Sequence, residues 1–206
     1  TEVSEVYKSF IDDSFIHIEG LEVLDKNGNI VTTEFIDYVT PLHKSKNYKA
    51  IHEYTTDNEL NLSYSEEEPM TKYSNFFGQD AFFMTASSNI QGRNVSRNFL
   101  HTYRETTLNL HTKEWRSVVS GNFSWDTRTF NITSVGTPSH AIYGNFGAAF
   151  SQRTTNVTRQ GTKSGRTARF TVRYNQVMTL GVGHLGGDLK FGTHQDSFTT
   201  GANALN

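Results

Sequence analysis

The sequence contains no cysteine among its 206 residues. Disulfide bonds, thiolate metal ligands and cysteine nucleophiles are therefore excluded together. Eukaryotic secreted domains of low apolar content usually depend on disulfides, and apolar residues make up only 35% of this chain. Because exported bacterial proteins often manage without disulfides, the composition leads us to expect a secreted, extracellular bacterial protein.

Long apolar runs are also missing. The longest apolar cluster, Ala81 to Met84, is far shorter than the roughly 18 residues that a membrane-spanning helix needs. Thr, Ser, Asn, Gly and aromatic residues are abundant, whereas Ala and Leu are scarce. This balance is typical of exposed antiparallel sheets.

Acidic residues are absent from Thr127 through Gly187. Residues 1–103 carry 8 basic and 16 acidic side chains, whereas residues 104–206 carry 11 basic and 5 acidic ones. This asymmetry indicates an anionic partner for the second half. The more common explanation of such a charge split is that the acidic half packs against the basic half, or that the arginines lie on a solvated sheet face.

Apolar periodicity in the first half predicts two helices and a hairpin. Val3, Tyr7 and Phe10 mark one stripe of an N-terminal helix that ends at residues 12–14. Residues 21–24 and 30–35 read as strands joined by a type I′ turn at Asn27-Gly28. A short helix is indicated near residues 48–54, and a strand at residues 60–64. The following aromatic cluster is expected in the core; it comprises Tyr73, Phe76, Phe77, Phe82 and Phe83.

The second half alternates between apolar and polar residues. Odd-numbered residues from Trp115 to Trp125 share one face of a predicted strand, and a second strand is predicted at residues 142–150. A polar turn is expected at residues 160–165, followed by a long alternating strand at residues 168–182. The alternation places Phe123, Trp125, Phe170 and Val172 in a common core.

These patterns predict a mainly β fold. We expect an antiparallel β-sandwich, or two small β domains, with a short N-terminal helix. The charge split suggests an acidic, β-rich region at residues 1–110 and a basic, antiparallel β region at residues 111–206, which together could form one continuous domain.

The stretch from residue 115 to 191 resembles a group of small secreted β proteins of Gram-positive bacteria, most of them without an assigned activity. The resemblance is carried by Trp115, by Val-Val-Ser-Gly-Asn-Phe-Ser-Trp at residues 118–125, by Ala-Arg-Phe-Thr-Val at residues 168–172 and by Gly181-Val182. Those relatives often have a pair of cysteines near the end, which this chain lacks. The resemblance implies an extracellular, sandwich-like module and no catalytic residues.

Motifs for catalysis and cofactors are weak. Residues 181–186 match the letters of a dinucleotide fingerprint, but a strand rather than a helix is expected after them, so they read as a β-turn and no nucleotide or other cofactor is predicted. No Gly-x-Ser-x-Gly string is present. Carboxylates such as Glu19, Glu22 and Asp37 could serve glycoside hydrolysis, but nothing separates them from surface charges. We therefore do not expect an enzyme.

A weak metal site is possible near the end of the chain, where imidazoles and carboxylates gather. Its candidate ligands are His184, Asp188, His194 and Asp196.

Three functions remain, and the first is favoured. A non-enzymatic module would engage an anionic cell-wall polymer, glycan or membrane surface, with or without forming a homo-oligomer. A membrane-active, pore-forming protein would use the long strand at residues 168–182, which exceeds the roughly 9–11 residues required. A hydrolase would use the metal site. Surface binding would rely on Arg153, Arg159, Lys163, Arg166, Arg169 and Arg173, with aromatic contacts from Trp115, Trp125, Tyr143 and Tyr174.

Overall fold

A computed structural model describes residues 2–69, 89–103, 113–144, 150–180 and 188–203. The described part is mainly β, with two antiparallel sheets and three α-helices. The helices are α1 (Glu5–Ile16), α2 (Thr32–Lys44) and α3 (Tyr48–Asp57), with a 3₁₀ turn at Ile18–Gly20. The strands are β1 (Leu21–Leu24), β2 (Asn61–Pro69), β3 (Ile90–Tyr103), β4 (Lys113–Asp126), β5 (Ile132–Val135), β6 (Ser139–Gly144), β7 (Phe150–Ser164), β8 (Thr167–Leu180) and β9 (Asp188–Thr200).

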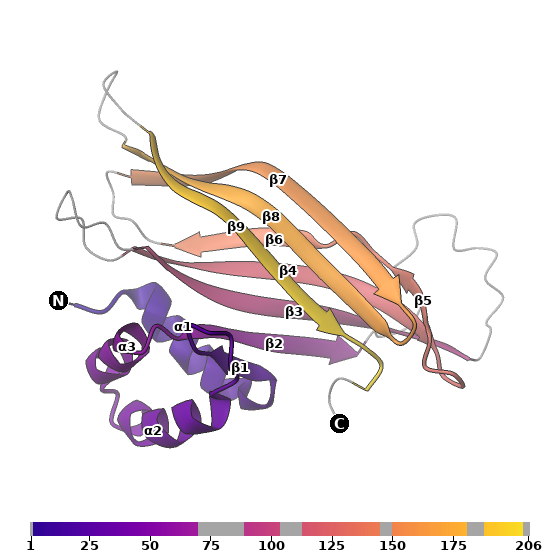
Figure 1. The fold of residues 1–206 in the computed structure, drawn as a ribbon, viewed down its shortest axis with the longest axis horizontal. Helices are drawn as coiled ribbons and strands as arrows, with labels where there is room; N and C mark the ends of the chain where they lie inside the picture. Colours follow the sequence, from indigo (N-terminus) through magenta and orange to yellow (C-terminus); the bar gives the residue numbers. More distant parts are fainter. Residues whose placement is uncertain (1, 70–88, 104–112, 145–149, 181–187, 204–206) are drawn as a thin grey trace.

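The larger sheet has the order β1-β2-β3-β4, and β5 and β6 both pair with β4 (Figure 1). The smaller sheet has the order β7-β8-β9. β3 pairs with β4 over the full length of both strands, from Ile90 opposite Asp126 to Tyr103 opposite Lys113. Strands from residues 1–110 and from residues 111–206 therefore belong to one sheet.

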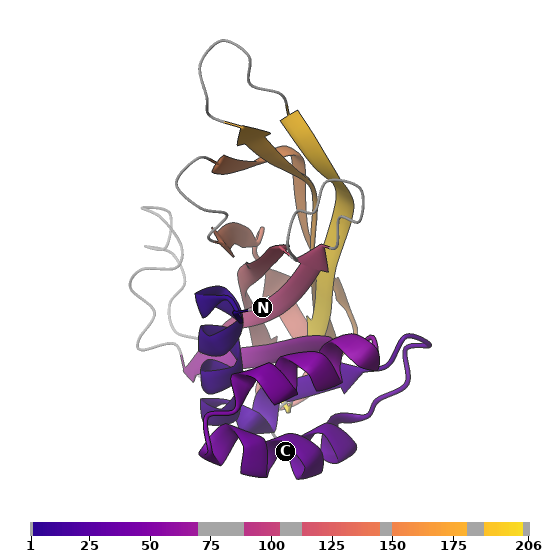
Figure 2. The same cartoon turned by 90° about the vertical axis from the view of Figure 1, so that its left-hand side faces the viewer.

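Three layers result from this arrangement. The helices lie on one side of the larger sheet, and β7, β8 and β9 lie on the other side (Figures 1 and 2). Tyr7, Phe10 and Phe35 of the helices are buried together with Val23 and Tyr64 of the sheet. A second core fills the space between the two sheets, and it includes Val95, Val119, Phe123, Trp125, Phe170, Val172 and Phe198.

The predicted alternation is confirmed on β4 and β8. Phe123, Trp125, Phe170 and Val172 share the inter-sheet core, and Phe170 and Val172 are fully buried. The helix at Tyr48–Asp57 and the strand from Asn61 are also confirmed. The N-terminal helix is confirmed but runs to Ile16, past the expected end at residues 12–14. Ser14 is buried within it, and its hydroxyl is satisfied by donating to the Ile11 carbonyl (2.8 Å).

The hairpin prediction is wrong in its second strand. Only Ile30 forms a bridge, opposite Leu24, and helix α2 begins at Thr32. The turn is held by Asp25, whose side chain accepts hydrogen bonds from the backbone of Asn27 and Asn29. Gly28 has a φ of 82°, but Asn27 is not among the residues with positive φ, so the turn is not type I′.

One further turn and one further strand were expected from the sequence, and the structure places them differently or only in part. The turn predicted at residues 160–165 is strand up to Ser164, and the chain reverses at Gly165 and Arg166. Of the strand predicted at residues 142–150, residues 142–144 belong to β6 and Phe150 begins β7, and residues 145–149 lie outside the described residues. The aromatic cluster at residues 73–83 and the glycine-rich bend at residues 181–187 lie outside the described residues. No helix in the described ranges combines the length and apolar character needed to cross a membrane.

Candidate functional site

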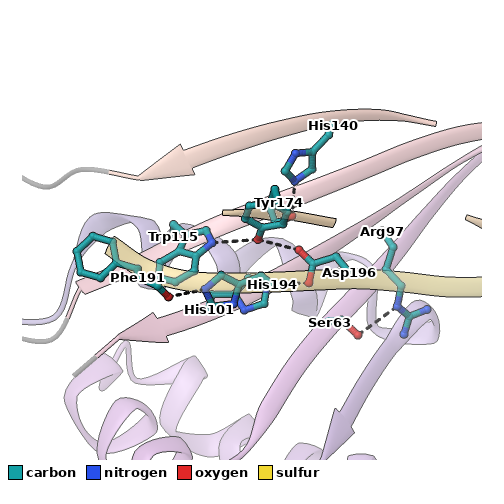
Figure 3. A network of polar contacts seen from close by, with 10 residues as sticks. Ser63, Arg97, His101, Trp115, His140, Tyr174, Phe191, His194 and Asp196 are labelled. Carbon is teal, nitrogen blue, oxygen red and sulfur yellow. Dashed lines mark hydrogen bonds and ion pairs between the residues drawn. The ribbon is translucent and has the colours of Figure 1, made fainter. Parts of the chain in front are cut away.

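A network of polar side chains lies between the two sheets, at the end of the sandwich near β9 (Figure 3). We call it the inter-sheet network. Its members come from five strands and are His101 (β3), Trp115 and Ser117 (β4), His140 (β6), Tyr174 (β8), and His194 and Asp196 (β9).

Asp196 is the centre of the network. Its Oδ1 lies 2.8 Å from His101 Nε2, and its Oδ2 accepts a hydrogen bond from the Tyr174 hydroxyl (2.9 Å). The Trp115 indole N–H donates to that hydroxyl in turn (3.2 Å). Burial alone would raise the pKa of the Asp196 carboxyl, but hydrogen bonds and the charge of His101 outweigh it, so the pKa is lowered. The network therefore holds Asp196 as a buried anion.

Two further histidines are packed around this carboxylate. His140 Nε2 lies 2.8 Å from Ser117 Oγ, and its ring packs on Tyr174 at 4.5 Å between centroids. His194 Nε2 donates to the Phe191 carbonyl (2.9 Å), and its ring lies 5.0 Å from that of His101. Burial lowers the pKa of both His140 and His194, so both are held mainly in the neutral form.

The connectivity of the network differs from that of a catalytic triad. In a triad the histidine that activates the serine is itself oriented by the carboxylate. Here Ser117 contacts His140, whereas Asp196 contacts His101. Ser117 is also fully buried, so no substrate can reach its hydroxyl. The network is suited to a structural role: its hydrogen bonds join the two sheets and keep the Asp196 carboxylate charged between them.

A hollow of about 560 Å³ opens beside the network, where the larger sheet extends beyond β9. We call it the β9 groove. β7, β8 and β9 lie over β3, β4 and β5, so the inner face of β1 and β2 has no strand opposite it in the described part. The groove is lined by Glu22, Ser63, Arg97 and His101 of the larger sheet and by residues 195–199 of β9.

Arg97 is the most buried arginine that lines the groove. Its side chain is only 13% exposed, and its Nε donates to Ser63 Oγ (3.1 Å; Figure 3). Its Nη2 lies 3.6 Å from a Glu22 carboxylate oxygen. Burial lowers the pKa of the Arg97 guanidinium, and the charge of Glu22 opposes this. A guanidinium has five N–H donors, and among the described residues only the Nε donor of Arg97 is hydrogen-bonded.

The outer face of the smaller sheet forms a second polar surface. Antiparallel partners point to the same side of a sheet, so the register places Arg169 and Arg173 of β8 beside Thr162 and Thr158 of β7. We call this surface the outer face. Over the stretch of β8 from Arg169 to Asn175, the described side chains of this face are hydroxyl, amide or guanidinium groups, and none of them is acidic: Thr158, Gln160, Thr162, Arg169, Thr171, Arg173, Asn175, Thr193, Gln195, Ser197 and Thr199.

Hydrogen bonds between neighbouring strands order the outer face. Arg169 Nε donates to Ser197 Oγ (3.0 Å), which lies 2.9 Å from Thr171 Oγ1. Thr193 donates to the Asn175 side-chain carbonyl (2.6 Å). The two arginines are four residues apart on one strand, a separation of about 13 Å.

The six predicted basic residues are all exposed but do not share one surface. Arg169 and Arg173 lie on the outer face. Arg159 and Lys163 point to the opposite side of β7, where Lys163 donates to the Thr133 carbonyl (2.7 Å). Arg166 lies in the β7–β8 turn over the Phe130 ring, and Arg153 lies near the start of β7.

The predicted aromatic contacts are mostly internal. Trp115, Trp125 and Tyr174 are buried, because their strand positions face the inter-sheet core, and only Tyr143 is exposed. They are therefore not the exposed platform expected from the sequence.

The predicted metal ligands are partly described. His194 and Asp196 do lie together on the inner face of β9, but they are engaged with Phe191 and His101. His184 lies outside the described residues, as does the Asp188 side chain. Within the described ranges, no group of three or more potential ligand side chains is placed to hold a metal ion.

Sequence reasoning missed His101, His140 and Arg97. The first two are isolated histidines on separate strands, and Arg97 lies in the first half of the chain, outside the acid-free stretch that drew attention. The alternation of β3 offered a signal, because Val95, Arg97, Phe99 and His101 share one face, and a charged residue on an apolar face is unusual.

The comparisons with known proteins do not indicate a family or a function. No protein family matches the sequence, and neither a curated protein nor a solved structure shows significant similarity to the chain.

Proposed function

We propose that the protein is a non-enzymatic, extracellular module that binds an anionic polymer or membrane surface through the outer face of β7, β8 and β9. The observation that carries the proposal is that the described side chains of this face include no acidic group, together with the exposure of Arg169 and Arg173. Guanidinium groups bind carboxylate and phosphate with paired hydrogen bonds.

The surrounding hydroxyl and amide groups support the same reading. They give a flat, hydrogen-bonding surface on which an extended polymer can lie across three strands. Arg169 is pre-oriented by Ser197 (3.0 Å), so less side-chain entropy is lost when it binds. Because both arginines are exposed, their attraction for an anion is screened by salt, with a Debye length of about 10 Å at 0.1 M and about 3 Å at 1 M.

The test compares two double variants with equal changes of net charge. Arg169→Glu/Arg173→Glu reverses the outer face, and Lys44→Glu/Lys49→Glu reverses two exposed lysines on the helical layer. Binding is measured by co-sedimentation with vesicles containing phosphatidylglycerol, with phosphatidylcholine vesicles as the neutral reference, and on immobilised dextran sulfate. Each basic residue contributes about 1 kcal/mol at an anionic surface, so the outer-face variant is expected to bind roughly tenfold more weakly or worse.

Equal binding by the two double variants would show that the outer face is not the determinant. Dye release from the same vesicles is recorded in parallel. Binding without release supports the module, whereas release that accompanies binding would favour the membrane-active alternative.

A further inference from the structure

A second opening adjoins the β9 groove. A hollow of about 540 Å³ lies between the start of β2, the first turn of α1 and the end of α3, and both hollows are lined by Asn61, Leu62, Leu100 and His101. The two hollows therefore adjoin at the end of β3, one on the side of β9 and the other on the side of the helices.

The lining of the β9 groove combines three kinds of group. Ser63, Ser197 and Thr199 supply hydroxyls, Asn61 and Gln195 supply amides, and Phe99 and Phe198 contribute apolar surface. The groups from Gln195, Ser197 and Thr199 belong to the outer face as well, which meets the groove at the edge strand β9. A sugar ring presents hydroxyl donors and acceptors around its edge and apolar C–H groups on its faces, so the same three kinds of group would complement it.

The charges of the groove point to an acidic substituent on that sugar. Asp196 is already engaged by His101 and Tyr174, so it offers little to a ligand. Arg97 retains guanidinium donors without a hydrogen-bond acceptor among the described residues, and Arg169 reaches the rim. Glu22 is the counter-charge to Arg97, but at 3.6 Å and with 44% of its side chain exposed it is loosely held.

We propose that the β9 groove binds a saccharide segment bearing a carboxylate or phosphate, with Arg97 as the residue that pairs with the acidic group. The proposal rests on the proposed function, because it names the sugar-acid component of an anionic polymer. An extended peptide is the less favoured occupant. Asp196 points inward from β9 and the β8–β9 register breaks near Gly192, and both features discourage the addition of a strand to that edge.

The experiment follows backbone amide NMR signals during titration with trigalacturonate, with maltotriose as the neutral match and glycerol phosphate as the phosphate arm. An acidic peptide of β-forming sequence is the fourth probe. We expect trigalacturonate or glycerol phosphate to shift the signals of β3 and β9 around Arg97 and Ser197, and maltotriose to bind more weakly. Whichever of trigalacturonate and glycerol phosphate binds more tightly shows whether the groove prefers a carboxylate or a phosphate.

Two substitutions give effects of opposite sign. Arg97→Gln removes the cation and should weaken binding of the acidic probe roughly tenfold or more, the loss expected for a hydrogen bond between charged groups. Glu22→Gln removes the competing carboxylate and should strengthen binding several-fold, which damage to the fold cannot imitate. Arg128→Gln breaks an exposed ion pair with Asp126 on the far turn and should leave affinity unchanged.

A third variant distinguishes binding in the groove from binding on the outer face. Arg173→Glu should weaken binding to dextran sulfate without changing the affinity for trigalacturonate. Absence of signal shifts in the groove with every sugar probe, or weaker binding by Glu22→Gln, would overturn the groove proposal and leave the outer face standing. Shifts in the groove with the peptide alone would overturn it in favour of strand addition.

Discussion

Gly121 of β4 faces Phe170 of β8 across the inter-sheet core, and the phenylalanine ring fills the place of a side chain at position 121. A Cβ atom built on Gly121 would lie 2.3 Å from Phe170 Cε1, far inside contact distance. Phe170 is fully buried and cannot swing into solvent. The glycine therefore sets how closely the two sheets approach.

The first prediction is that Gly121→Ala lowers the free energy of unfolding by about 1–3 kcal/mol, the usual cost of overpacking a core. Urea denaturation measures it. The control is the double variant with Phe170→Leu, whose smaller side chain vacates part of the space. The cost of Gly121→Ala should be smaller in that background, and strictly additive costs would show that Phe170 is not the obstacle.

The second prediction concerns the β1–α2 turn. Gly28 has a φ of 82° and open space around its Cα, so only backbone conformation opposes a side chain there. Gly28→Val should destabilise the protein by about 1 kcal/mol or more, because β-branched residues resist positive φ. Gly28→Asn should cost less, because asparagine tolerates this region. Equal melting temperatures for all three proteins would mean that the turn does not constrain the fold.

The third prediction concerns Gln176, a fully buried amide on β8. Its Nε2 donates to Gln152 Oε1 (3.2 Å), but its own carbonyl oxygen has no partner in the described structure. Because an unsatisfied buried polar group costs about 1–3 kcal/mol, Gln176→Met should raise the free energy of unfolding by about 1 kcal/mol. The exposed replacement Gln160→Met should change it by less than about 0.5 kcal/mol. Destabilisation by Gln176→Met would contradict the assignment of an unsatisfied oxygen.

The fourth prediction is a loss of stability in mild acid. Burial lowers the pKa of His140 and His194 in the folded state, whereas an unfolded histidine titrates near about 6.5. Below that pH the unfolded chain binds more protons than the folded one, so the free energy of unfolding falls as the pH drops from about 6.5 through the folded-state pKa. The lowered pKa of Asp196 adds a further loss at lower pH, where its carboxylate is protonated.

The histidine effect is isolated by substitution. Urea denaturation between about pH 7 and pH 5 is compared for the wild type and His140→Gln/His194→Gln. The variant should show a flatter dependence on pH, because two of the groups that take up protons on unfolding are gone. His17→Gln is the matched control, since His17 lies at the surface beside Glu66 (3.3 Å). If the free energy of unfolding of the double variant depended on pH as steeply as that of the wild type, other groups would be responsible for the loss of stability in acid.

The sheets were predictable from sequence where one face of a strand is buried. From Trp115 to Trp125 every odd-numbered residue is buried, so alternation gives both the strand and its inward face. Helix α2 was not predictable in this way. Ile30, Val31 and Phe35 suggest a strand, whereas the buried positions Phe35 and Val39 are one helical turn apart, and packing on β1 decides the outcome.

The candidate sites were less accessible to sequence reasoning. His101, His140 and Asp196 meet because β3, β6 and β9 converge, and no spacing along the chain encodes that meeting. Period two does place His194 and Asp196 on one face, so two of the seven members of the network could be grouped from the sequence. The acid-free stretch pointed correctly to a basic second half, but only strand register separates Arg169 and Arg173 from Arg159 and Lys163.

The polar contacts that fasten α1 to the larger sheet also set an order of events during synthesis. Ser4 donates to Glu114, and Asp13 accepts from Arg116 (2.7 Å), so each pair spans more than 100 residues of chain. The first helix therefore cannot dock fully until the ribosome has made β4, a wait of about 5–20 s at typical rates of elongation. Throughout that interval Phe10 lacks the Arg116 guanidinium that packs over its ring in the folded protein.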